Sequence, residues 1–178
     1  MKTIKLLSIL AIAFLSFTVV SCSDDDDSSG GSSCITLVDQ NVQGSFRGTD
    51  FVSPAGFYTV LTFGENTNIG GKIYVKEAID SDCIFPEFEG TDDIILFPIP
   101  SLEEQTITLE EFGENTLNFN RIVIEDGTAV TEVELAECGT ITITNYDADN
   151  GILEGTVVAR GQFGSTVNGN FRLELCEF

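Results

Sequence analysis

The sequence from Thr140 to Thr144 reads TITIT, and the sequence from Phe171 to Leu175 reads FRLEL. Both stretches alternate strictly between apolar and polar residues. Because successive side chains of a β-strand point to opposite faces, a period of two predicts strands with one buried and one solvated face. The two stretches therefore indicate an all-β domain.

Shorter runs of the same kind recur along the chain, with clusters of Gly, Asn and Asp between them that are typical of turns. One such cluster is DADNG at residues 147–151. The shorter runs surround Ile35, Phe46, Tyr58, Ile73, Ile95, Ile107, Phe119, Val133 and Val157. We expect a single antiparallel β-sandwich or barrel-like domain of about 9–11 strands.

The first part of the chain has a different pattern. Lys2 and Lys5 are followed by an apolar run from Leu6 to Val20. The run is about 15 residues long, whereas a bilayer-spanning helix needs roughly 20. It therefore predicts a signal peptide that is removed, rather than a permanent membrane span.

Residues 19–22 read VVSC and resemble the lipobox of bacterial lipoproteins. The resemblance implies cleavage after Ser21 and acylation of Cys22. Each buried methylene contributes about 0.8 kcal/mol, so two or three acyl chains would anchor the protein firmly in a membrane. The alternative is an ordinary secretory signal in which the cysteine is incidental.

Residues 23–33, which follow Cys22, contain only Ser, Asp and Gly. They offer no apolar side chain to bury and therefore predict a flexible tether. The start of this segment, Ser23 followed by Asp24, Asp25, Asp26 and Asp27, resembles the export signal of surface lipoproteins in the Bacteroidota. That resemblance implies a protein on the outer face of the outer membrane. A simple solvated spacer is the alternative.

We therefore expect three parts: a removed signal peptide (1–21), a lipidated cysteine with its tether (22–33), and an all-β domain (34–178). The formal net charge is −21, and removal of the signal peptide takes away Lys2 and Lys5 but no acidic residue. Such a chain repels phosphate backbones, which excludes nucleic acid as a partner.

Four further cysteines, Cys34, Cys83, Cys138 and Cys176, are compatible with two disulfides in an oxidising compartment. The alternation of the flanking residues places Cys34 and Cys176 on the outer face of their strands, which favours that pair. Cys83 and Cys138 are expected in short acidic loops and would form the other pair. A Cys138–Cys176 pair is disfavoured, because the two residues would lie at opposite ends of a three-stranded meander.

The last part of the domain has a recognisable pattern. It runs from GTITI at 139–143 through YD at 146–147 and LEGTV at 153–157 to VNGNF at 167–171. This order resembles the C-terminal signature of uncharacterised Flavobacteria-type surface lipoproteins of the Bacteroidota. Those proteins are all-β envelope proteins with a domain of unknown function, so the resemblance implies no catalytic residues.

Chemistry is restricted by the absence of histidine from the sequence. Ser-His-Asp and Cys-His nucleophiles are excluded, and zinc-type cysteine spacing is missing. Two carboxylates could still support a glycoside-type hydrolase, with the acidic stretch around Glu87 and Asp93 as the densest candidate. Asn145, Asp147 and Asp149 mimic the first ligands of a calcium loop, although a hairpin turn explains them as well.

The expected function is a non-enzymatic lipoprotein of the outer membrane, anchored through Cys22 and facing the cell exterior. It would bind a protein or glycan partner or have a structural role. A lipocalin-like carrier of a small apolar ligand is one alternative, which requires an empty, Phe-lined interior. The carboxylate hydrolase is the other.

Overall fold

The computed structural model describes residues 35–77, 92–126 and 128–177. The described residues all belong to one compact unit. This unit contains one ten-stranded sheet, which confirms the all-β prediction. Within the described ranges, no helix is long and apolar enough to cross a membrane.

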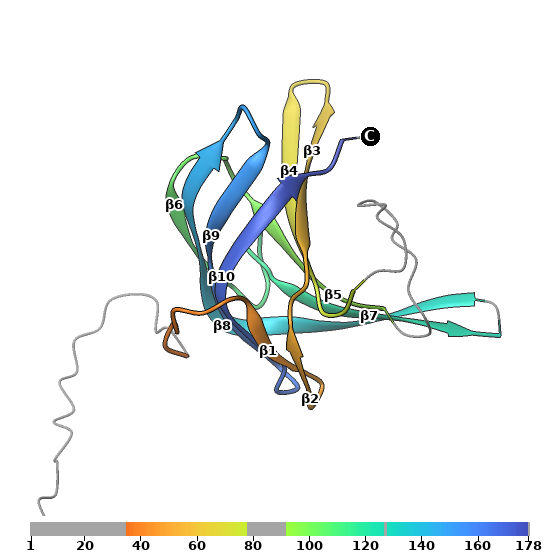
Figure 1. Ribbon diagram of the computed structural model, residues 1–178. Helices are drawn as coiled ribbons and strands as arrows, with labels where there is room; N and C mark the ends of the chain where they lie inside the picture. Colours follow the sequence, from red (N-terminus) through yellow and green to blue (C-terminus); the bar gives the residue numbers. More distant parts are fainter. Residues whose placement is uncertain (1–34, 78–91, 127, 178) are drawn as a thin grey trace, which may run out of the picture. The chain divides into compact units, whose positions relative to one another are not determined.

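Figure 1 shows the ten strands of the described residues. In chain order they are β1 (Gln43–Phe46), β2 (Thr49–Val52), β3 (Gly56–Phe63), β4 (Asn66–Tyr74), β5 (Asp92–Ile99), β6 (Gln105–Thr108), β7 (Asn118–Glu125), β8 (Thr128–Asp147), β9 (Ile152–Gly161) and β10 (Thr166–Leu175).

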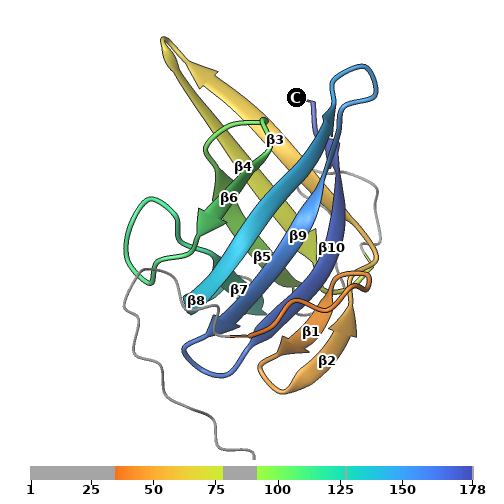
Figure 2. The ribbon, with the colours of Figure 1, turned by 90° about the vertical axis from the view of Figure 1, so that its left-hand side faces the viewer.

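Seven strands form a ring in the order β10, β3, β4, β5, β7, β8, β9 and back to β10 (Figure 2). Neighbours in the ring are antiparallel except β3 and β10, which are parallel at Phe57 opposite Glu174 and Tyr58 opposite Leu175. An odd number of strands cannot alternate in direction all the way round, so closure needs one parallel pair. Of the two arrangements left open by the sequence, the ring is the barrel-like one.

One sequence-based prediction, for the segment that forms β8, was wrong. The runs around Val133 and Thr142 were expected as two strands, with Cys138 in an acidic loop between them. They form a single strand of 20 residues, in which Cys138 lies opposite Arg160 of β9. A bulge between Ala136 and Cys138 absorbs the irregular sequence without ending the strand.

The prediction for the N-terminal part of the domain was also wrong. Residues 35–42 do not form the strand expected around Ile35, and the first strand begins at Gln43. Strand β2 was not expected, because four residues carry too little alternation to be recognised. Strands β1 and β2 extend the sheet beyond β10, while β6 pairs with β8.

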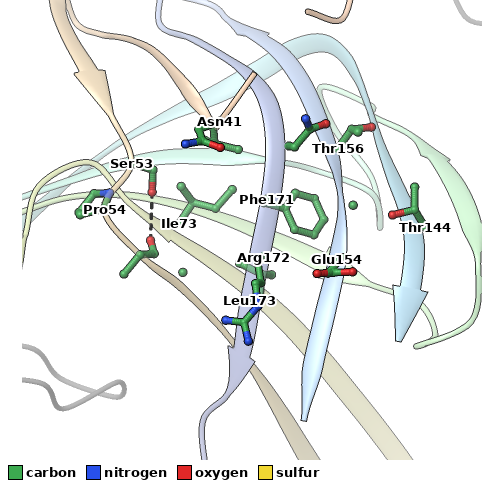
Figure 3. Close-up of a pocket in the computed structure, with 15 residues that line it drawn as sticks. Asn41, Ser53, Pro54, Ile73, Thr144, Glu154, Thr156, Phe171, Arg172 and Leu173 are labelled. Atoms are coloured by element: carbon green, nitrogen blue, oxygen red, sulfur yellow. Dashed lines mark hydrogen bonds between the residues drawn. The ribbon is translucent and has the colours of Figure 1, made fainter. Parts of the chain in front are cut away.

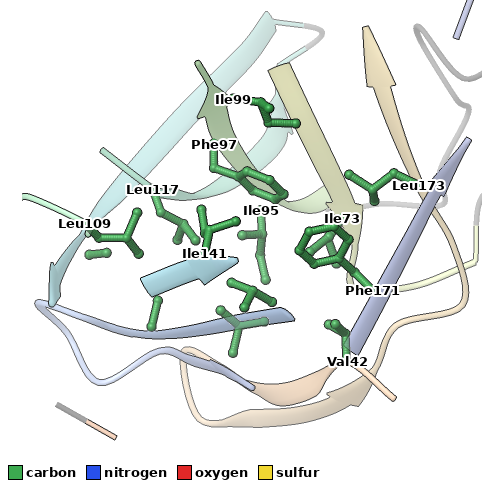
Figure 4. Close-up of a cluster of buried hydrophobic side chains, with 14 of the residues drawn as sticks. Val42, Ile73, Ile95, Phe97, Ile99, Leu109, Leu117, Ile141, Phe171 and Leu173 are labelled. Atoms are coloured by element: carbon green, nitrogen blue, oxygen red, sulfur yellow. The ribbon is translucent and has the colours of Figure 1, made fainter. Parts of the chain in front are cut away.

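The interior of the ring is filled by apolar side chains from all sides (Figure 4). At its centre the rings of Phe97 and Phe171 lie 5.9 Å apart. Each ring lies against a glycine of the neighbouring strand: a Cβ built on Gly71 would collide with Phe97, and one built on Gly155 would come within 2.6 Å of Phe171. The two glycines therefore provide the space that the two aromatic rings occupy.

Candidate functional site

The predicted lipidation and export residues cannot be placed. Cys22, Ser23 and the aspartates Asp24 to Asp27 lie outside the described residues.

Two of the four domain cysteines are described, Cys138 and Cys176, and both are disulfide-bonded. The strand register keeps them apart, since Cys138 lies opposite Arg160 and Arg160 lies opposite Thr166, ten residues before Cys176. Ten residues of strand span about 33 Å, whereas disulfide-bonded cysteines have Cα atoms within about 7 Å. Cys138 and Cys176 are therefore not partners of each other, as expected.

The predicted orientation of Cys176 was wrong. Cys176 was expected on a solvated face, but it is buried, and its N–H donates to the carbonyl of Tyr58 at 2.8 Å. This happens because β10 ends at Leu175 and the chain continues along β3. Cys34 and Cys83 lie outside the described residues, so the pairing itself stays a prediction.

Of the three candidate calcium ligands, Asn145 and Asp147 lie at the end of β8, and Asp149 lies in the turn between β8 and β9. Asp147 Oδ1 accepts hydrogen bonds from the backbone N–H groups of Asp149 (3.1 Å) and Asn150 (3.2 Å). The Asn145 side chain instead donates to Glu154 on β9 at 3.1 Å. Among the described side chains, no group of three His, Cys, Asp or Glu is placed to hold a metal ion. Calcium binding stays a prediction.

The Asp147 carboxylate acts here as the cap of the turn. Its Oδ2 accepts a hydrogen bond from Asn150 Nδ2 at 2.7 Å. This bond, together with those from the backbone N–H groups, lowers the pKa of Asp147 below its usual value. The carboxylate therefore stays ionised, and the turn stays capped, to lower pH than for a free aspartate.

The acidic stretch considered for hydrolysis has one described carboxylate with a defined partner. Asp93 accepts two hydrogen bonds from Arg121, at 2.7 and 2.8 Å, across strands β5 and β7. Such a bidentate pair fixes the strand register and occupies both carboxylate oxygens. Glu87 lies outside the described residues.

The carrier alternative requires an empty interior. The contact between Phe97 and Phe171 and the burial of the surrounding side chains leave the ring interior filled. The described part of the domain therefore gives no support to a ligand held inside the ring.

Hollows open instead at the surface of the ring, each lined by outward-facing side chains together with some buried core side chains. One is a groove of about 460 Å³ beside β10, where β1 pairs with residues 166–168 and β3 with residues 174–175. Between these two neighbours, Asn170 of β10 is hydrogen-bonded to Gln40 and Val42. Ser53, in the link from β2 to β3, is in turn bonded to Val42. Figure 3 shows Ser53 and Pro54 on one side of β10, and Thr144 and Glu154 on the other.

The exposed side of this groove is polar. Arg172 pairs with Glu174 at 2.8 Å, and Glu154 accepts from Asn145 at 3.1 Å. The Ser53 hydroxyl donates to the carbonyl of Ala55 at 3.0 Å. These groups offer hydrogen-bond donors and acceptors on a rigid sheet, which is an arrangement suited to binding a polar surface.

A second, larger hollow of about 1020 Å³ covers the outer face of β3, β4 and β5. Phe57, Leu61, Leu96 and Pro98 contribute apolar surface to it, and Lys72 contributes a positive charge. Both hollows involve side chains of several strands that are distant in sequence. The sequence alone could not have identified either, because each strand shows only its own alternation.

Glu134 is a further residue that the sequence did not single out. It is fully buried on β8, and its carboxylate accepts hydrogen bonds from the N–H groups of Phe163 (2.8 Å) and Ser165 (3.0 Å) and from the Ser165 hydroxyl (2.6 Å). These bonds fix the turn between β9 and β10. Nothing in the local sequence distinguishes Glu134 from the solvated acids around it.

No protein-family model, curated protein or solved structure matches the chain.

Proposed function

We propose that the chain is a non-enzymatic lipoprotein of the outer membrane, of the surface-exposed type found in the Bacteroidota. It is anchored through acylated Cys22 and binds a macromolecular partner, a protein or a glycan, with the outside of its ring. The observation that carries the proposal is the VVSC sequence at residues 19–22, followed directly by Ser23 and four aspartates.

The domain supports a binding role on its outer surface. Its interior is occupied by its own side chains, so a ligand must bind outside. The two hollows over β3–β5 and beside β10 supply apolar surface and fixed polar groups, respectively. A net charge of −21 disfavours nucleic acid as the partner and favours neutral or basic surfaces.

Protease treatment of intact native cells tests the proposal. We expect a surface protein to be digested while a periplasmic control protein stays intact, because the outer membrane excludes the protease. The matched control is Cys22→Ser, which removes the thiol that would carry the lipid. This variant should be released from the membrane fraction. Protection of the wild-type domain until lysis would contradict surface exposure, and retention of Cys22→Ser in the membrane would contradict the anchor.

A further inference from the structure

Two phenylalanines are displayed to solvent at one end of the ring. Phe112 and Phe163 are 75% and 72% exposed, more than any other large hydrophobic side chain among the described residues. Phe112 lies between β6 and β7, and Phe163 lies in the turn between β9 and β10. The two segments meet, because Gln162 Nε2 donates to Glu111 Oε1 at 2.7 Å.

The backbone position of Phe163 is fixed. Its N–H donates a hydrogen bond to the buried carboxylate of Glu134, which also accepts one from the N–H of Ser165. The Ser165 hydroxyl in turn accepts from the N–H of Arg47 at 3.0 Å. A large apolar side chain on a fixed turn loses little conformational freedom when it is buried by a partner, so it is suited to insertion.

The N-terminal segment of the domain joins the ring near the same end. Asn168 of β10 accepts from the N–H of Val38 (2.9 Å) and donates to the carbonyl of Thr36 (2.8 Å), as a neighbouring strand would. Asn170 donates to Asp39 at 2.7 Å. Asn168 follows Ser165 by three residues, or about 10 Å of strand. The preceding chain is therefore attached close to the turn that carries Phe163.

The length of that preceding chain limits how far this end can lie from the anchor. Cys22 precedes Ile35 by 13 residues. Such a segment spans at most about 45 Å when fully extended and about 20 Å on average when flexible. The β3–β4 turn lies at the opposite end of the ring (Figure 2). A strand of ten residues, such as β10, spans about 33 Å.

We propose that Phe112 and Phe163 insert into the surface of the lipid bilayer that holds the anchor. This inference rests on the lipid anchor of the proposed function. The contact is apolar, because Glu110 and Glu114 flank the Phe112 segment and repel anionic headgroups. Insertion is therefore favoured by zwitterionic lipid and insensitive to salt. Anchoring makes this contact intramolecular, so two phenylalanines suffice where a free domain would need more.

A tryptophan reporter tests the inference, since the sequence contains no tryptophan. The Phe163→Trp variant of the lipidated protein is reconstituted into phosphatidylcholine vesicles that contain lipid brominated near the headgroup. We expect its emission to shift to shorter wavelength and to be quenched, as for a side chain at the headgroup boundary. The matched control is Leu61→Trp near the β3–β4 turn, where the side chain is 36% exposed. Its emission should be unchanged.

Flotation of the same vesicles separates the two proposals. Co-flotation with an unquenched Phe163→Trp overturns the membrane contact and leaves the anchor intact, and so does equal quenching of both variants. Absence of co-flotation overturns the anchor and the contact together. A blue shift of Phe163→Trp that appears only in native envelopes, without quenching by brominated lipid, would mean that a protein covers the phenylalanines and would also overturn the proposal.

Discussion

Gly71→Ala is expected to lower the free energy of unfolding by about 2–3 kcal/mol, as overpacking of a filled core does. The added methyl group would overlap the ring of Phe97, which is buried and itself lies against Phe171. The ring cannot move aside without disturbing the second aromatic ring. Urea denaturation followed by far-UV circular dichroism measures the change.

The neighbouring residue provides the matched control. A Cβ on Gly70 would have Thr59 Oγ1 as its nearest neighbour, at the ordinary contact distance of 3.7 Å. Gly70→Ala should therefore change stability by less than about 0.5 kcal/mol, or raise it slightly, since alanine loses less backbone entropy than glycine. Adding Phe97→Leu to Gly71→Ala should recover part of the loss. Equal effects of the two glycine substitutions would show that Phe97 does not depend on the space at Gly71.

Glu134→Ala is expected to cost about 3–4 kcal/mol, because it leaves two backbone N–H groups and one hydroxyl without their buried acceptor. Glu134→Gln should cost less, since the amide oxygen still accepts and the Ser165 hydroxyl can reorient. The matched control is Glu132→Ala, on the same strand, whose side chain is half-exposed and pairs with Arg47. That surface pair should contribute less than about 1 kcal/mol.

Thermal or urea denaturation of the three variants checks this ordering. If Glu134→Ala and Glu132→Ala lose the same stability, the buried carboxylate does not hold the β9–β10 turn. Glu134→Ala would also remove the acceptor of the Phe163 backbone N–H.

The regular part of the fold was predictable because strands with one solvated face carry a local signal. Burial alternates along the whole of β10 except its last residue and along β9 as far as Val157, and both strands were expected. The ring was not predictable, because its closing contact joins Tyr58 to Leu175. Contacts between residues so far apart leave no periodic mark on either segment.

Strand β8 shows where local patterns mislead. The sequence around Val133 alternates, yet the structure buries Glu134 and leaves Val133 exposed. Alternation identifies a strand but does not say which of its faces is inside when a buried polar group has long-range partners. Gly139 follows Cys138, which was expected in a loop. It lies within the strand, where a Cβ would collide with the carbonyl of Val158.

Of the candidate site, only the contacts within a single turn were predictable from the sequence. The turn at Asp147 was recognised from residues close together in the chain, because its bonds are local. The groove beside β10 and the paired display of Phe112 and Phe163 depend on contacts between distant segments. The proposed lipid anchor is the opposite case, since the pattern that predicts it consists of consecutive residues and the proposal rests on sequence alone.

Mass spectrometry of the N-terminal peptide of the mature protein, purified from the cell envelope, tests the proposed lipid anchor. We expect a peptide that begins at Cys22 and carries a diacylglyceryl group on the thiol. A peptide that begins elsewhere, or one in which Cys22 is unmodified, would contradict the anchor and with it the proposed place of this protein at the membrane.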